Sequence, residues 1–265
     1  MRLSRRQALK TLVAGAVATA IPKSVFADDR LEVILDVYVS DLPGDKVSES
    51  YNSAGHGQWP QIFDRVKEFY SEHDIDIRVR FKKDGEQTAL RNDHIAVEYT
   101  TLDRIFGLPS WDRVFELGGP DLVERAKGLV AQRMEETGTD YETAEKDLLQ
   151  EFCDSIKSKL SSKLTGIASK YAHKARVFPQ ENIQDDQERI NTYATAICHE
   201  VGHALGLEHS AELVLIEGQK KMRFQYAENN FMTPAQENEQ ERKFDITMHP
   251  EQRDQIKKYI ACGSK

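Results

Sequence analysis

Residues 199–209, which read HEVGHALGLEH, constrain this chain of 265 residues more than any other feature. His199 and His203 are four residues apart, so on a helix both imidazoles project from one face and can share a metal ion. Gly206 marks the point at which such a helix must end, because a residue without Cβ can enter the left-handed conformation and reverse the chain. That reversal can bring His209 round as a third nitrogen ligand.

The residue types in this run indicate a catalytic zinc site rather than a structural one. Three neutral imidazoles leave the fourth position of a tetrahedral Zn²⁺ ion open, as catalytic sites do. Glu200 lies beside the histidine pair, where a carboxylate can take a proton from water. The motif therefore predicts Zn²⁺ as the cofactor, His199, His203 and His209 as its ligands, and Glu200 as the catalytic base.

At these residues the chain resembles the metzincin zinc endopeptidases, whose signature HExxHxxGxxH is matched at every specified position. Ser210 follows directly, and the resulting sequence LGLEHS (residues 205–210) resembles that of the matrixin branch in particular. The resemblance implies a turn with a methionine beneath the zinc, for which residues 229–234 (NNFMTP) are the candidate. Met232 and Gly206 are therefore expected to support the site. A rival Met-x-Pro at residues 248–250 is expected to open a terminal helix instead.

The resemblance also implies an α+β fold, in which a twisted mixed β-sheet packs on two long helices. Apolar residues at strand and helix spacing predict elements in an order that suits this fold. Strands are predicted over residues 31–39, 75–81 and 94–101, and helices over residues 59–71, 186–205 and 251–260. The zinc helix carries a continuous apolar stripe for the core, formed by Ile190, Ala194, Ile197, Val201 and Leu205.

Residues 102–164 form an insertion that departs from the matrixins, which place a loop with structural zinc and calcium sites there. This segment contains no histidine. Its apolar spacing predicts helices over residues 120–136 and 140–160, with Thr139 and Glu142 at the spacing of a capping box. A helical hairpin that packs on the catalytic domain is the simpler interpretation, and a lid or a surface for an inhibitor or target protein is the alternative.

Two stretches after the insertion, residues 166–168 and 172–179, loosely resemble the strand at the upper rim of matrixin clefts. Such an edge strand pairs with an extended substrate through main-chain hydrogen bonds. His173 within it is interpreted as a surface side chain and not as a zinc ligand. Residues 235–245 are expected to shape the pocket next to the zinc.

The first 27 residues predict an export signal peptide. They contain five basic residues and no acidic one, followed by an apolar run and small residues that favour cleavage after Ala27. Residues 4–10 (SRRQALK) resemble a twin-arginine signal, and an ordinary secretory signal is the alternative. The apolar run is shorter than the roughly 20 residues of a membrane span, and no cysteine follows it for a lipid anchor. The expected location is periplasmic or extracellular.

Without residues 1–27 the chain keeps 31 of its 36 basic residues against 44 acidic ones, a net charge of −13. Such a charge disfavours nucleic acid and anionic membranes as partners. The three cysteines permit three alternative single disulfides: Cys153 with Cys198, Cys153 with Cys262, or Cys198 with Cys262. Cys198 is predicted to be a small buried residue rather than a metal ligand, because its side chain points about 100° away from His199 round the helix.

Residues 28–265 are therefore predicted to form the catalytic domain of an exported zinc endopeptidase, whose substrates are proteins or peptides. Two alternatives stay open. One is a hydrolase of the same fold that acts on a non-peptide amide. The other is a catalytically inactive protein that holds zinc and serves as a binding scaffold. The sequence does not indicate the oligomeric state or the cleavage specificity.

Overall fold

The computed structural model of the chain describes residues 30–39, 57–82, 86–107, 109–159, 166–179, 183–209, 211–215, 222–226, 229–233 and 244–263. The export signal expected over residues 1–27 lies outside these ranges, as does nearly all of the segment 235–245. By its internal contacts the chain divides into residues Met1–Arg30 and Leu31–Lys265, and the second unit is described below.

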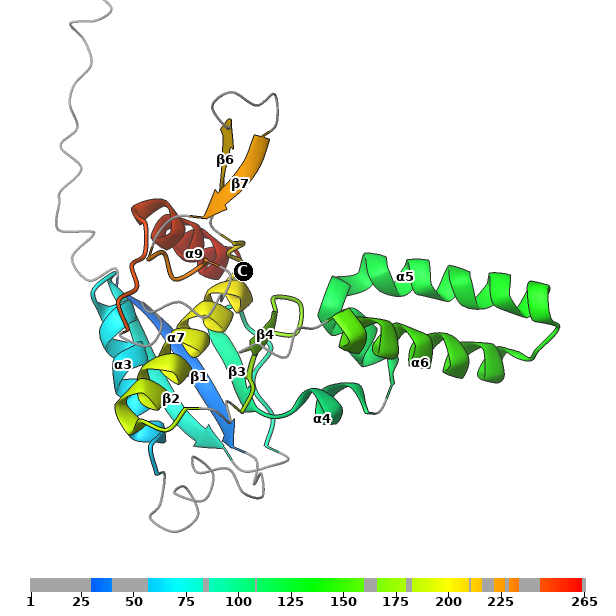
Figure 1. Cartoon of the computed structure of the whole chain (residues 1–265), viewed down its shortest axis with the longest axis horizontal. Helices are drawn as coiled ribbons and strands as arrows, with labels where there is room; N and C mark the ends of the chain where they lie inside the picture. The colour runs from blue at the N-terminus through cyan, green and yellow to red at the C-terminus, as the bar shows by residue number, and fades with distance from the viewer. Residues whose placement is uncertain are drawn as a thin grey trace, which may run out of the picture. The chain divides into compact units, whose positions relative to one another are not determined.

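A five-stranded mixed sheet forms the centre of this unit (Figure 1). Its strands are β1 (Leu31–Val39), β2 (Ile75–Lys82), β3 (His94–Tyr99), β4 (Gly166–Ser169) and β5 (Lys174–Val177), in the spatial order β2-β1-β3-β5-β4. All neighbouring pairs are parallel except β4 and β5, which are antiparallel. Strand β4 therefore ends the sheet as an edge strand of opposite direction.

Side chains alternate between the two faces of the sheet, as the sequence predicts. Val33, Leu35 and Val37 of β1 are buried in the main hydrophobic core. On the other face Asp36 is fully buried and accepts two hydrogen bonds from the guanidinium of Arg80, at 2.7 and 3.0 Å. A buried carboxylate is tolerated there because a bidentate arginine neutralises it.

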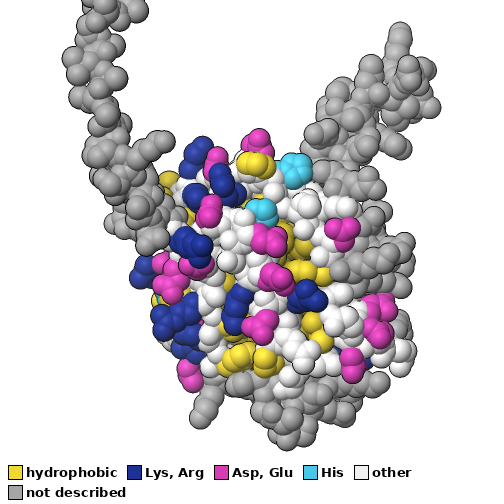
Figure 2. Space-filling model, turned by 90° about the vertical axis from the view of Figure 1, so that its left-hand side faces the viewer, with side chains coloured by type: hydrophobic (Ala, Val, Ile, Leu, Met, Phe, Trp, Pro, Cys, Tyr) yellow, Lys and Arg dark blue, Asp and Glu magenta, His cyan; other side chains and the backbone are white. Residues whose placement is uncertain are grey.

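Helices α3 (Trp59–Ser71) and α7 (Asp186–Ala204) pack on the apolar face of the sheet and on each other. Their boundaries agree closely with the predicted helices, and all five residues of the apolar stripe on α7 are buried. The outer surface of α3 carries charge pairs three residues apart, and Figure 2 shows basic and acidic side chains intermingled on this side. Helix α9 (Pro250–Gly263) closes the same core through Ile256 and Ile260. The predicted α+β fold is thus confirmed.

The insertion contains α4 (Leu102–Phe106), α5 (Trp111–Thr137) and α6 (Tyr141–Lys159), and α5 packs along α6 (Figure 1). Two small apolar clusters, separate from the main core, hold it together. The predicted helix over residues 120–136 is confirmed: Gly119, with φ +68°, breaks α5, and the part after this break begins at Pro120 and ends at Thr137. The part of α5 before the break, residues 111–118, was not predicted.

The start of α6 differs from the prediction. Asp140, and not Thr139, caps this helix, because the Asp140 carboxylate accepts hydrogen bonds from the backbone N–H and the hydroxyl of Thr143. A carboxylate at an N-cap also opposes the positive end of the helix dipole, which a threonine hydroxyl does not.

Strands β6 (Ala211–Leu215) and β7 (Met222–Tyr226), which the sequence analysis did not predict, form an antiparallel pair just after the histidine motif. All three cysteines are free, so none of the alternative disulfides forms; Cys198 is buried as predicted. Over the described ranges, no helix combines the length and apolar character needed to cross a membrane.

Candidate metal centre

Helix α7 positions the histidine motif, and local interactions determine where it begins and ends. The Asp185 carboxylate accepts a hydrogen bond from the backbone N–H of Glu188 at 2.7 Å and so caps the first turn. Gly206 has φ +86°, and the backbone N–H of Leu207 then donates to the carbonyl of Gly202. The left-handed residue ends the helix where the sequence predicts and directs the chain back toward the motif.

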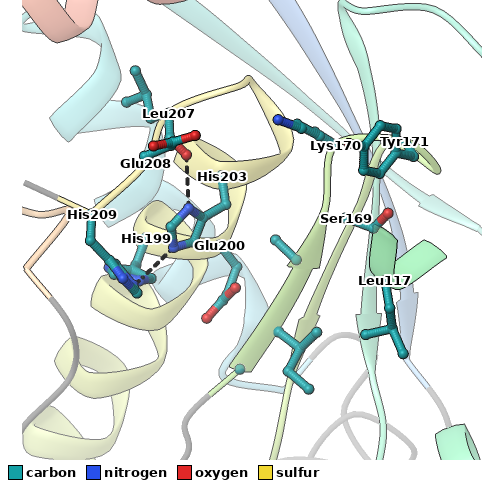
Figure 3. Close-up of a pocket in the computed structure, with 13 residues that line it drawn as sticks. Leu117, Ser169, Lys170, Tyr171, His199, Glu200, His203, Leu207, Glu208 and His209 are labelled. Atoms are coloured by element: carbon teal, nitrogen blue, oxygen red, sulfur yellow. Dashed lines mark hydrogen bonds between the residues drawn. The ribbon is translucent and has the colours of Figure 1, made fainter. Parts of the chain in front are cut away.

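This reversal brings the three predicted ligands together (Figure 3). The Nε2 atom of His199 lies 3.1 Å from that of His203 and 3.3 Å from that of His209. One nitrogen from each ring lies within 4.8 Å of the others, so the group could hold a metal ion. His199 is buried, His203 half-buried and His209 exposed, which leaves the group open on one side.

Hydrogen bonds to backbone carbonyls fix the orientation of two of the rings. Nδ1 of His199 donates to the carbonyl of Phe231 at 2.7 Å, and Nδ1 of His203 donates to the carbonyl of Leu207 at 2.8 Å. Because a carbonyl only accepts, each Nδ1 carries the proton and each Nε2 offers a lone pair. Metal-ligating histidines are oriented in this way by a second hydrogen bond.

The donor set and its spacing fit a tetrahedral zinc ion. With Zn–N bonds of about 2.0–2.1 Å, the ligand nitrogens of a tetrahedral site stand roughly 3.3 Å apart. Burial, together with the neighbouring His203, lowers the pKa of His199 to about 3, and burial also lowers the pKa values of His203 and His209. The imidazoles are therefore neutral at pH 7, and lone pairs this close repel one another unless a cation lies between them.

The turn at residues 229–233 packs against α7 next to the histidines. Met232 is fully buried, and its backbone N–H donates to the side chain of Asn230 at 3.0 Å. The turn can approach α7 only because Gly202 has no side chain: a Cβ there would lie 2.5 Å from the sulfur of Met232 and 2.8 Å from the ring of Phe231. Sequence analysis singled out Met232 but missed Gly202 and the Phe231 carbonyl, which the backbone alone supplies.

The rival motif at residues 248–250 does not form the turn beneath the histidines but leads into helix α9. Thr247 pairs with the backbone of Asn229, and Pro250 opens α9 as expected.

Glu200 lies next to the histidines with its carboxylate directed toward β4 (Figure 3). Burial raises the pKa of this carboxyl to about 8. The carboxylate reaches β4 because residue 166 is a glycine, where a Cβ would stand 2.6 Å from Cγ of Glu200. Gly166 is thus a further residue that shapes the site, and only its position opposite Glu200 in the fold reveals it.

A pocket of about 430 Å³ joins these groups. One wall carries the histidines and Glu200, and the other is formed by residues 166–171 of β4 and the turn that follows it. Leu117 of helix α5 also lines it. The two stretches predicted as one rim are therefore two strands. Only β4 forms the edge, and β5 lies inside the sheet. His173, in the turn between them, does not belong to the histidine group that could hold a metal ion.

Helix α9 ties the two walls of the pocket together. The amide of Gln255 donates to the carbonyl of Gly206 at 2.9 Å, on the histidine side. The hydroxyl of Tyr259 donates to the carbonyl of Lys170 at 3.2 Å, on the strand side. The ring of Tyr259 also covers Gly206, where a Cβ would meet it at 2.9 Å. The width of the pocket thus depends on one helix that contacts both sides.

In comparisons with known proteins, the chain matches no protein-family model and no curated protein sequence.

Proposed function

We propose that this protein is a zinc-dependent endopeptidase of the metzincin type. One observation supports this proposal above all: three neutral imidazole nitrogens converge at the spacing of a tetrahedral zinc site, and a buried carboxylate that need not ligate the metal lies beside them. The five-stranded sheet with an antiparallel edge strand, and Met232 buried under α7, are compatible with the same family.

His199, His203 and His209 would hold the ion through their Nε2 atoms. When bound, zinc supplies a Lewis acid that polarises a carbonyl group and makes water more acidic. Glu200, whose pKa is raised by burial, would ionise more readily beside a bound cation, since an opposite charge favours the carboxylate form.

Glu200 acts as a proton carrier in the proposed reaction. It accepts the proton of the water that attacks the scissile carbonyl and then donates that proton to the departing amide nitrogen. Strand β4 would bind the substrate, because the outer edge of an edge strand offers backbone N–H and C=O groups to an extended peptide. Gly166 keeps this edge close to the Glu200 carboxylate.

The proposal includes export. Residues 1–27 carry the basic, apolar and small-residue zones of a signal peptide in the required order. We expect a mature chain that begins near Asp28 outside the cytoplasm. Replacing both Arg5 and Arg6 with lysine blocks export if the signal is of the twin-arginine type, and unchanged export indicates the general secretory route.

The decisive test separates catalysis from metal binding. We expect Glu200→Ala to retain about one zinc per chain and to lose at least 10²–10⁴-fold in hydrolysis of a peptide found with a proteome-derived library. His209→Ala is the matched variant, because it removes a ligand and is expected to lose the metal as well as the activity. A zinc-loaded parent that cleaves no peptide or protein overturns the proposal, and cleavage of a non-peptide amide in its place identifies the alternative hydrolase.

A further inference from the structure

We propose that the helical insertion selects the substrate: Leu117 of α5 and Tyr171 of the β4–β5 turn form an apolar wall of the cleft that accepts a large apolar or aromatic side chain of an extended peptide. This inference rests on the proposed function, because it names the class of substrate for the same pocket.

Both residues of this wall lie at the candidate metal centre. Leu117 and Tyr171 line the same pocket as His203 and Glu200, although Leu117 belongs to the insertion. Figure 3 shows the histidines on one side of β4, and Leu117 and Tyr171 on the other. A peptide laid along β4 projects alternate side chains to opposite sides, so one of them meets this wall.

The side chains around this wall favour an apolar side chain of the substrate. Tyr171 is 40% exposed and Phe115 is 38% exposed, and their ring centroids lie 6.2 Å apart. Exposed aromatic pairs next to a cleft offer a large apolar surface at small cost in side-chain entropy. The ammonium of Lys170 lies 5.4 Å from the centre of the Tyr171 ring, which disfavours a basic substrate side chain at the same place.

Hydrogen bonds to the sheet fix this wall in place. Glu116, which lies between Phe115 and Leu117, is buried and accepts hydrogen bonds from Arg176 and Lys174 of β5, each at 2.9 Å. The carbonyl of Glu116 also accepts a hydrogen bond from the hydroxyl of Ser169 on β4. The first turns of α5 are thereby attached to both strands, so Leu117 holds a constant distance from the edge strand.

The Tyr171 ring is fixed as well. It packs on Gly119, where a Cβ would stand 2.6 Å from the ring, and the φ of +68° at this glycine produces the break in α5. The break that prevents α5 from continuing as one straight helix therefore creates the space that the aromatic ring fills. A fixed wall of this kind discriminates between side chains by size.

The test uses the full mature chain and peptides built on a site that the parent cleaves. These peptides differ at single positions, with Phe, Leu, Ala or Lys. We expect the parent to prefer Phe or Leu over Ala at one position by tenfold or more in kcat/KM, and to disfavour Lys there. Leu117→Ala and Tyr171→Ala should each reduce this ratio by about tenfold. Leu117→Trp, which fills the space instead, should shift the preference toward Ala.

Peptide binding can also be measured without hydrolysis. In the Glu200→Ala background, fluorescently labelled Phe and Ala peptides should differ in Kd, and Leu117→Ala should remove most of that difference. Leu129→Ala is the matched control, since Leu129 is a 51% exposed leucine on the same helix that does not line the pocket. Zinc content and circular dichroism verify that each variant is folded.

The outcomes distinguish the two proposals. If the parent cleaves peptides but its preference is the same in Leu117→Ala, Tyr171→Ala and Leu117→Trp, the wall does not select the substrate, and the proposed function stands without it. If the zinc-loaded parent neither cleaves nor binds any peptide, both proposals are overturned.

Discussion

Two glycines without any metal-binding atom shape the candidate site. Gly202 lets the turn at residues 229–233 reach α7, and Gly166 lets β4 reach Glu200. Each works through the absence of a side chain, at a point where another part of the chain comes closer than a Cβ would allow. The positions of the histidines and of Glu200 therefore depend on two glycines that contribute no ligand atom and are not fixed positions of the HExxHxxGxxH motif.

We expect Gly202→Ala to weaken metal binding. The new Cβ would lie 2.5 Å from the sulfur of Met232, so the turn must move away from α7 and carry the Phe231 carbonyl away from Nδ1 of His199. The loss of such an orienting hydrogen bond typically costs 10–100-fold in metal affinity. The strain of overpacking costs about 1–3 kcal/mol in the free energy of unfolding. Zinc titration and thermal unfolding measure the two effects.

Gly128→Ala is the control for this change. A Cβ at Gly128, also on a helix, has no atom within 4 Å. This substitution should leave zinc affinity unchanged and stabilise the protein by about 0.5–1 kcal/mol, because alanine favours the helix. Equal zinc affinity in both variants would show that the turn does not orient His199.

Between elements, the junction of the insertion with the sheet depends on Glu116. This carboxylate accepts hydrogen bonds from Arg113 of its own helix and from Lys174 and Arg176 of β5, and Arg176 is also bound to Glu98 of β3. Burial alone would raise the pKa of Glu116, but the Arg176 guanidinium, with Lys174 and Arg113, outweighs this and holds the pKa below its ordinary value of 4.5.

The lowered pKa predicts how stability depends on pH. The ionised Glu116 stabilises the fold above about pH 4.5, and that contribution is lost as the pH falls through the lower pKa of the folded state. Glu116→Gln should therefore be less stable than the parent by about 2 kcal/mol at pH 7, the magnitude of a hydrogen bond between charged groups. The difference should shrink steadily as the pH falls below about 4.5. Urea unfolding at a series of pH values measures it.

The exposed pair of Arg133 and Glu151 provides the comparison for this experiment. Its two hydrogen bonds, at 3.0 and 2.7 Å, resemble those of Glu116 in geometry but join α5 to α6 at the surface. Since solvent screens exposed ion pairs, Glu151→Gln should change stability little at any pH. A Glu116→Gln variant that behaves in the same way would mean that the insertion does not depend on this network.

For the whole molecule, metal removal should reduce stability. The lone pairs of the three histidine nitrogens repel one another without a metal ion and are attracted to a bound cation. A ligand present at 1,000 times its Kd stabilises the folded state by about 4 kcal/mol. For a domain of this size we expect chelation to lower Tm on the order of 10 °C. Added zinc should restore it. The Tm of His209→Ala should not respond to either treatment, and a parent Tm that is insensitive to chelation contradicts the site.

Much of the fold could be predicted from the sequence because most elements carry regular patterns. The alternation of residues 75–81 and the stripe on α7 follow from burial of one face, and the structure bears both out. Residues 111–118 of α5 were not predicted to be helical, whereas the start at Pro120 was, because proline favours the first turn of a helix. Strands β6 and β7 were missed as well.

The candidate site was predictable to the extent that it is local in sequence. Four chemical groups lie within eleven residues, and helix geometry together with Gly206 suffices to place them. The remaining contributions come from distant positions: the Phe231 carbonyl, Gly166, Leu117 and Tyr259. Their roles arise from contacts across the fold and have no signature in composition or spacing.

The contacts of α9 also close large loops of the chain. Gln255 and Tyr259 reach Gly206 and Lys170, which lie 49 and 89 residues earlier in the chain. The closure of such loops costs conformational entropy, and contacts of this range slow folding. During synthesis on the ribosome, all three histidines emerge before the helix that joins the two walls. If the proposed function holds, the cleft is complete only once α9 has packed on both walls, so a nascent chain that still lacks α9 would be spared self-cleavage.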